Sequence, residues 1–352
     1  MKLIGHLASF LSYAIFGLNI VMCKDIANSD VLTPYALFFL RALGATVLFW
    51  LTSLFVRNRR QTKNNGACLD CRGAKEEGVA NRRQTKNNRA CLDCRGAKEE
   101  GVANEHVTHR DMLLIIVASF LGLLMPQMTF LIAIRESSSI DTSLVSTLAP
   151  IFTMFFAAYF IKEPITWKKI LGVMISFVGV VFIILNSLHF HQGGTSSQTS
   201  VTGFVLLFLN CFTFALYLGA FRPLIARYSV VIFMRWMFLF TMLMSCPFCI
   251  GDTITFISST LASAGSAQSP NLYWEISYVI VFATFVAYFL IPIGQKYIRP
   301  TLVSMYSYVQ PIIAVVFSIC LGLDTLTWTK CIAVVMIFLG VTIVNRSRTV
   351  IK

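Results

Sequence analysis

Residues 146–180 read STLAPIFTMFFAAYFIKEPITWKKILGVMISFVGV, and residues 307–341 read SYVQPIIAVVFSICLGLDTLTWTKCIAVVMIFLGV. When the two stretches are aligned at a constant offset of 161, eleven of their 35 positions are identical. Apolar helices match by composition alone, but composition does not supply matched Pro, Thr-Trp, Lys and Gly residues. The alignment therefore indicates an internal repeat. The matched pairs include Ser146 and Ser307, Pro150 and Pro311, Trp167 and Trp328, Lys169 and Lys330, and Gly179 and Gly340.

The composition places this repeat in a membrane. Apolar residues make up 56% and charged residues 13% of the 352-residue chain, and the mean hydropathy is +0.72. A soluble protein has about 45–50% apolar and roughly 25% charged residues. The formal net charge is +13, but thirteen of the 29 Lys and Arg residues fall between Arg57 and Arg110. The charge is thus not spread over a folded basic face, which excludes nucleic acid as a partner and leaves the lipid bilayer.

Ten segments are apolar enough to cross a hydrocarbon core of about 30 Å, which takes about 20 residues in a helix. The first segment is followed by Cys23, Lys24 and Asp25 rather than by a small-residue cleavage site, so we expect it to be retained. The sequence predicts an all-α membrane protein with ten transmembrane helices. Their approximate bounds are 3–22, 33–56, 112–134, 139–161, 168–187, 201–221, 229–250, 276–295, 301–322 and 328–345.

The basic residues between the spans predict the orientation. Placing both termini in the cytoplasm assigns 24 Lys and Arg residues to inside segments and only three to outside segments, while Arg41 and Arg235 lie within spans. Short cytoplasmic loops carry an excess of Lys and Arg. We therefore expect a multi-pass protein of the cell (inner) membrane, with cytoplasmic N- and C-termini.

The offset between the matched stretches divides the chain into two halves of five spans each. An odd number of spans makes the second half cross the membrane in the opposite sense, so the sequence predicts two inverted five-helix repeats, an arrangement typical of secondary transporters. Arg41 and Arg235 recur at a different offset, 194, as a longer loop in the first half would cause. The expected domains are 1–56 (spans 1 and 2), 57–110 (an insertion), 111–187 (spans 3 to 5), 201–346 (spans 6 to 10) and 347–352 (a cytoplasmic tail).

The insertion at 57–110 contains a second repeat, in which residues 58–80 recur as 81–103 with a single change, from Gly66 to Arg89. Its polar composition cannot bury enough apolar surface to fold alone, so we expect a disordered cytoplasmic segment. Each copy has a C-x-x-C pair, at nearly the separation of a zinc ribbon. Because the duplication itself sets this separation, an inert reduced loop is favoured over a zinc site, and no metal or cofactor is expected. The pairs are Cys68 with Cys71 and Cys91 with Cys94.

Residues that would support catalysis are missing from the spans. None of the five His residues lies near the middle of a span, and no Walker, G-x-S-x-G or H-E-x-x-H pattern occurs. Cys246 and Cys249 form a C-P-x-C pair, but small residues near a proline kink explain it better than a redox centre without a partner. The sequence therefore favours a protein that is neither an enzyme nor an ATP-driven pump.

Polar side chains inside the spans are the candidates for a binding site. Amides and hydroxyls in hydrocarbon need partners, so they either join helices or line a cavity. We expect a central cavity where spans 1, 3, 6, 8 and 9 meet. Arg41 is a weaker candidate, because Arg41 and Arg235 also fit a structural anchor present in both halves. The candidate substrate-binding residues are Asn19, Gln127, Tyr217, Tyr288, Tyr308 and Arg41.

The pattern as a whole is similar to the EamA-type branch of the drug/metabolite transporter superfamily, except in the insertion. Asp324 replaces the usual Glu of the second half, a departure that leaves the resemblance in place. The residues that carry it are Phe16-Gly17-Leu18-Asn19, Arg41, Leu148-Ala149-Pro150, Lys162-Glu163-Pro164-Ile165-Thr166, Gly172, Gly179, Gln310-Pro311, Gly322-Leu323-Asp324 and Gly340.

This resemblance implies a function. It implies a secondary transporter, commonly an exporter, that moves small organic metabolites such as amino acids by alternating access through a cavity between the repeats. The alternative is a non-transporting membrane assembly or sensing protein, with the insertion as an interaction tail. The expected partners are a small-molecule substrate and the bilayer, and the sequence leaves a homodimer open.

Overall fold

The computed structural model describes residues 2–76, 107–162, 199–262 and 270–322, with scattered positions between 166 and 182 and between 328 and 343. Within these ranges every regular element is helical. Eight helical segments of the described chain are long and apolar enough to cross a membrane, which confirms an all-helical, multi-spanning fold. They run over residues 3–28, 34–55, 109–136, 139–161, 201–220, 230–260, 271–297 and 300–320. The predicted spans 168–187 and 328–345 and the tail 347–352 fall largely outside the described residues.

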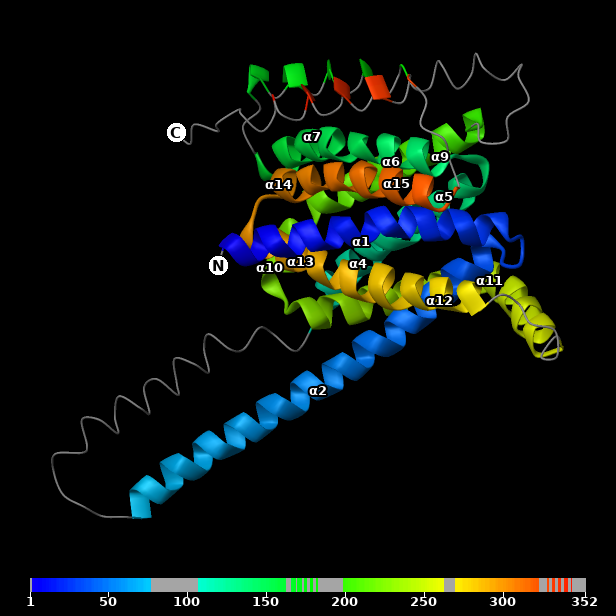
Figure 1. Cartoon of the computed structure of the whole chain (residues 1–352). Helices are drawn as coiled ribbons and strands as arrows, with labels where there is room; N and C mark the ends of the chain where they lie inside the picture. Colours follow the sequence, from blue (N-terminus) through cyan, green and yellow to red (C-terminus); the bar gives the residue numbers. More distant parts are fainter. Residues whose placement is uncertain are drawn as a thin grey trace.

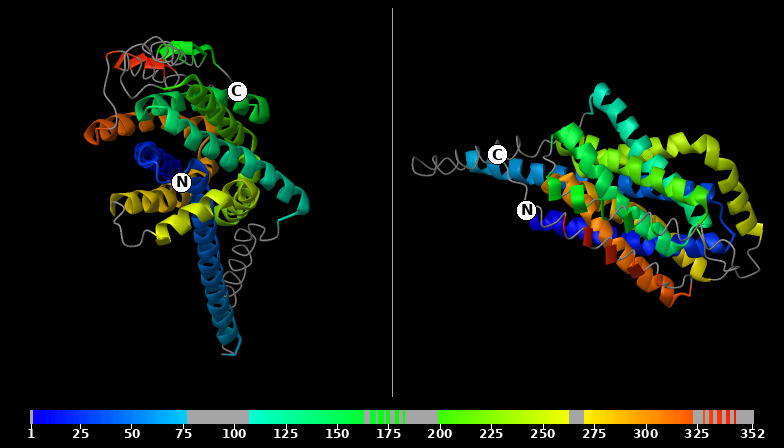
Figure 2. Two further views of the ribbon diagram at one scale, coloured as in Figure 1. Left: turned by 90° about the vertical axis from the view of Figure 1, so that its right-hand side faces the viewer. Right: turned by 90° about the horizontal axis from the view of Figure 1, so that it is seen from above.

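The first two helices are longer than the sequence predicted. Helix α1 (Lys2–Asn28) continues past residue 22, and the ammonium of Lys24 donates to the carbonyl of Ile134 at 3.1 Å. Helix α2 (Pro34–Glu76) leaves the apolar region after Phe55 and projects away from the bundle (Figures 1 and 2).

The extension of α2 corrects part of the expectation for the insertion. Residues 57–76 continue the helix, although the sequence predicted disorder from residue 57 onward. A formed helix gains one hydrogen bond per added residue without a new nucleation step, and the Arg, Gln and Lys residues that follow Phe55 are good helix formers. Residues 77–106, with Cys91 and Cys94, lie outside the described part, as do the side chains of Cys68 and Cys71.

The third span of each half contains a π-helical turn. In the first half, α4 (His109–Ser119) passes into η1 (Phe120–Leu124) and then α5 (Met125–Ala133), and the short 3₁₀ turn η2 (Ile134–Glu136) ends the span. In the second half, α12 (Pro270–Tyr278), η5 (Val279–Val286) and α13 (Ala287–Tyr297) follow the same order. Turns of this kind are rare and recur at functional sites.

The fourth span of each half is broken by a 3₁₀ turn. Helix α6 (Ser139–Val145), η3 (Ser146–Leu148) and α7 (Ala149–Ile161) correspond to α14 (Pro300–Met305), η6 (Tyr306–Tyr308) and α15 (Val309–Cys320). Proline has no N–H and its ring excludes the carbonyl four residues earlier. Pro150 and Pro311 each follow a serine by four residues, so the matched Ser-x-x-x-Pro pattern accounts for both breaks.

The matched segments lie against each other in opposite directions. Helix α6 packs beside α15, and α7 packs beside α14, with η3 and η6 in contact between them (Figure 1). The Ser318 hydroxyl, near the end of α15, donates to the Ser139 hydroxyl at the start of α6, at 2.8 Å. The chain thus brings the two repeated sequences into antiparallel contact at the centre of the bundle.

The remaining helices surround this pair. Helix α9 (Val201–Ala220) packs on α7, the short α10 (Arg222–Arg227) follows it, and α11 (Val230–Ala262) packs along α2. The pattern Cys246-Pro247-Phe248-Cys249 lies within α11, which continues through the proline. Helix α1 lies between α13 and α15 and approaches α15 closely at a glycine, because a Cβ added to Gly17 would stand 2.9 Å from the Cβ of Ile313.

Candidate functional site

A cavity of about 630 Å³, the open solvent at its mouth included, lies where the broken helices meet α1, α2 and α9. Residues from both halves of the chain line the cavity, so neither repeat forms it alone. The polar or thiol-bearing lining residues are Tyr13, Asn19, Arg41, Gln127, Ser146, Asn210, Cys211, Tyr288, Ser307 and Gln310. The apolar lining residues are Phe16, Ile20, Pro126, Phe130, Ala149 and Phe214.

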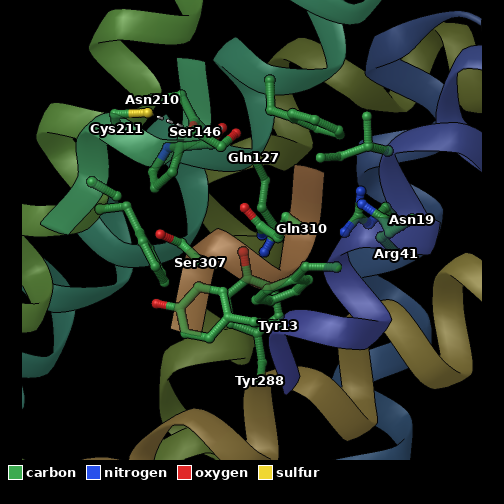
Figure 3. Close-up of a pocket in the computed structure, with 16 residues that line it drawn as sticks. Tyr13, Asn19, Arg41, Gln127, Ser146, Asn210, Cys211, Tyr288, Ser307 and Gln310 are labelled. Carbon is green, nitrogen blue, oxygen red and sulfur yellow. Dashed lines mark hydrogen bonds between the residues drawn. The ribbon is translucent and has the colours of Figure 1, made fainter. Parts of the chain in front are cut away.

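The structure brings four of the six candidates named from the sequence to this cavity. Figure 3 shows Asn19 and Arg41 on one side, Ser307 on the other, and Gln127 and Gln310 between them. Tyr288 also lines the cavity. All these residues project from segments that the sequence predicted as spans.

Tyr217 and Tyr308 are not among the lining residues of this cavity. The ring of Tyr217 lies against Gly122, whose added Cβ would stand 2.6 Å from the ring, and stacks on Phe221 with a centroid distance of 6.1 Å. Tyr308 is buried in an apolar cluster that includes Leu148. Both tyrosines are therefore packed in apolar clusters beside the cavity and outside its lining.

Two serines were missed as candidates although the repeat alignment pairs them. Ser146 is the first residue of η3 and Ser307 lies within η6, and the two line the cavity from opposite halves of the chain. A serine matched in both repeats and placed four residues before a matched proline marks a helix break, and breaks near the midplane of transporters form binding sites. This signal was present in the sequence.

Arg41 is 2% exposed and is held by a neighbouring π-helical turn. Its Nε donates to the Thr284 hydroxyl at 2.9 Å, and that hydroxyl donates to the Val279 carbonyl at 2.8 Å across the turn η5. Its Nη1 lies 4.0 Å from the Cys23 sulfur. No carboxylate of the described residues comes within salt-bridge distance of Arg41. The guanidinium is therefore oriented by neutral groups.

Arg235 lies in a different setting. It is half-buried between α2 and α11, where its Nη1 donates to the Ser53 hydroxyl at 2.7 Å. Its guanidinium carbon stands 5.2 Å from the ring centre of Trp50 and 5.6 Å from that of Trp236. Arg235 is not part of the cavity lining.

The cavity presents hydroxyl groups that its own walls do not satisfy. Tyr13 is 2% and Ser307 is 1% exposed, and neither hydroxyl has a hydrogen-bond partner among the described residues. An unsatisfied buried hydroxyl costs roughly 1–3 kcal/mol. With three phenylalanines in the wall, the cavity offers polar contacts at separate points and an apolar surface between them. Such a lining suits a small organic molecule.

Comparisons with known proteins agree with this architecture. The model of the EamA-like transporter family matches residues 99–185 and 201–346. An uncharacterized transporter of Bacillus subtilis strain 168, YcxC, is 26% identical over 211 residues, which are 58% of this chain and 64% of that protein. The match thus spans less than two thirds of this relative. An uncharacterized transporter of Archaeoglobus fulgidus is 25% identical over 217 residues, 60% of this chain and 69% of that protein.

A solved structure titled "Crystal structure of protein" shares the fold. It superposes on this chain with a TM-score of 0.57 at 15% identity, and the superposition covers 97% of this chain and 95% of the solved chain. The family match extends over more than half of the chain, and the matched part contains both fourth spans with their 3₁₀ breaks. The chain therefore belongs to the EamA-like transporter family.

Proposed function

We propose that the protein is a secondary transporter that moves small organic metabolites, such as amino acids, across the cell membrane by alternating access. The observation that carries the proposal is the central cavity, which residues of both repeats line. We further propose that it acts as an exporter and that both termini are cytoplasmic, as the distribution of basic residues favours.

The antiparallel contact between the matched segments supports alternating access. Helices α6 and α7 of one half pack beside α15 and α14 of the other. Two inverted units of similar structure have two near-equivalent packings, which expose a central site to one side of the membrane or to the other. The breaks η3 and η6 lie where such a change would bend the helices, since 3₁₀ segments inside a helix often mark hinges.

Solute flux in proteoliposomes that contain only this protein tests the proposal. We expect the purified protein to exchange labelled amino acids or other small metabolites, and we expect Ser146→Leu and Ser307→Leu to slow exchange because each fills part of the cavity. Ser258→Leu, on the exposed surface of α11, is the matched control and should exchange normally. A folded protein that exchanges no solute of a broad panel would favour the assembly or sensing alternative.

Labelling from one side of the membrane tests the orientation. Ala226 and Ser29 are exposed and lie at opposite ends of the bundle, because α10 neighbours the start of α4 through the Arg227–Asp111 pair whereas Ser29 follows α1. In a chain without its ten native cysteines, an impermeant thiol reagent added outside should label Ser29→Cys and spare Ala226→Cys. The reverse pattern would overturn the proposed orientation.

A further inference from the structure

The charge of the cavity points to the chemistry of its ligand. Arg41 is the one charged side chain among the described lining residues, and the other polar residues of the lining are neutral. A charge inside a membrane protein is costly unless it is paired. Arg41 is 2% exposed and forms no salt bridge with the described residues, so no anion among them balances its buried charge.

The orientation of the guanidinium leaves donors for such an anion. Arginine has five N–H donors in a fixed plane, and the Thr284 hydroxyl accepts from Nε. The remaining described contact, 4.0 Å from Nη1 to the Cys23 sulfur, is long and involves a weak acceptor. Two terminal nitrogens are therefore available, and their geometry matches the two oxygens of a carboxylate.

We propose that the cavity binds small organic carboxylates and that Arg41 is their counter-ion. The inference rests on the proposed transport function and names its substrate class. A single cation balances a monoanion, whereas a phosphate dianion would keep an uncompensated charge in the cavity. Phe16, Phe130 and Phe214 supply the surface for an apolar body.

The unsatisfied hydroxyls complete the description of the ligand. Ser307 lies across the cavity from Arg41 (Figure 3). A carboxylate with a second polar group at its far end would meet both Arg41 and the hydroxyls of Ser307 or Tyr13. A carboxylate without one would leave these hydroxyls unpaired, so it would bind more weakly.

The first test uses isosteric pairs of probes on the full-length protein in lipid nanodiscs. Phenylacetate and phenylacetamide have the same shape and differ in charge, and a panel of other carboxylates, each with its own amide, extends the comparison. We expect at least one carboxylate to bind at least tenfold more tightly than its amide, by calorimetry and by thermal stabilisation. If no carboxylate of the panel exceeds its amide, the inference is wrong, and this result needs no variant.

Variants then assign the preference to one residue. Arg41→Gln should remove the difference between the carboxylate and its amide, and Arg41→Lys, which keeps the charge without the planar fork, should retain part of it. Arg235→Gln is the matched control and should keep the full difference. A preference that persists in full in Arg41→Gln would overturn the assignment.

Flux separates this inference from the transport proposal. Carboxylate binding that depends on Arg41, without exchange in proteoliposomes, would leave the ligand class standing and refute transport. Exchange of amides as fast as carboxylates, unchanged in Arg41→Gln, would leave transport standing and refute the ligand class.

Discussion

Arg41 in α2 and Arg235 in α11 each follow a short apolar run, Phe39-Leu40 and Phe233-Met234. The two arginines nevertheless have different surroundings in the folded bundle. Arg41 faces the central cavity, where its Nε is held by Thr284 of the other half. Arg235 lies against two tryptophan faces and the Ser53 hydroxyl, away from the cavity.

The difference shows how two matched positions of the sequence come to differ in the folded bundle. The position of an arginine along its helix persists in both halves, but its energetic role depends on the neighbours that the fold supplies. Contacts with the faces of Trp50 and Trp236 stabilise the Arg235 cation by about 0.5–2 kcal/mol. Among the described residues no ring face covers the Arg41 cation in this way. In the proposed function Arg41 therefore serves the ligand, whereas Arg235 serves a structural contact.

The largest effect is expected from a larger side chain at the close contact between α1 and α15, beside the cavity. In Gly17→Val, the new Cβ would stand 2.9 Å from the Cβ of Ile313 and 3.1 Å from the Cα of Gln310, which is backbone and cannot move aside. Overpacking costs about 1–3 kcal/mol, so the yield and the melting temperature of purified protein should fall sharply. Gly251 of α11, the helix that carries Arg235, has nothing within 4 Å, and Gly251→Val should melt near the native temperature.

A smaller but more specific effect is expected at the acceptor for Arg41. Thr284→Val keeps the side-chain shape and removes the oxygen that accepts from Nε. A hydrogen bond to a charged group contributes about 1.5–3 kcal/mol, so carboxylate affinity should fall about tenfold while amide affinity is unchanged. Thr284→Ser should restore it.

Thr241 of α11 provides the control for this substitution. It is equally buried and donates to the carbonyl of Met237, as Thr284 donates to Val279, but Arg41 donates to Thr284 and not to Thr241. Thr241→Val should therefore leave the ratio of carboxylate to amide affinity unchanged. Equal losses in Thr241→Val and Thr284→Val would mean that Thr284 acts on folding alone.

On the Arg235 side, a substitution should change stability and leave transport intact. Trp50→Leu removes one of the two ring faces over the guanidinium and should lower the free energy of unfolding by about 0.5–2 kcal/mol. Flux per folded molecule should stay within about twofold, since the site has no contact with the cavity lining. Trp274→Leu, at a side chain that is 66% exposed, is the control for loss of a tryptophan alone. A loss of flux without a loss of stability would place Arg235 in the transport cycle.

The smallest effect is expected from deleting residues 58–103. The extension of α2 beyond Phe55 projects away from the bundle, and neither arginine depends on it (Figure 1). Shortening a connection changes its closure entropy only slightly, so folded yield and flux should match those of the intact chain. Reduced flux in the deletion would show that the segment acts on the carrier.

Features that depend on local chemistry could be predicted from the sequence. The apolar lengths predicted eight of the spans that the structure contains, and the matched prolines account for the breaks before Pro150 and Pro311. Disorder from residue 57 was predicted from composition, which carries no information on how far an existing helix propagates.

The candidate binding residues show the same difference between what local chemistry predicts and what packing decides. Asn19 and Gln127 were expected at the cavity because polar groups at that depth need a polar environment. The same reasoning selected Tyr217, which the structure places against Gly122 instead. A span that is apolar on all sides has no periodic polar face, so its sequence does not show which side meets the cavity.

The sequence by itself determined that the chain spans a membrane many times, that its two halves share a pattern, and where proline interrupts the fourth spans. The length of an apolar segment and the missing N–H of a proline are properties of each segment alone, so they do not depend on the rest of the fold. Only the tertiary structure decided that Arg41 meets a cavity and Arg235 meets two tryptophans. That outcome depends on helix rotation and on partners more than 180 residues away, Thr284 for one and Ser53 for the other. The surroundings of both arginines are set by packing between segments that are distant in the sequence, and no local pattern encodes that packing.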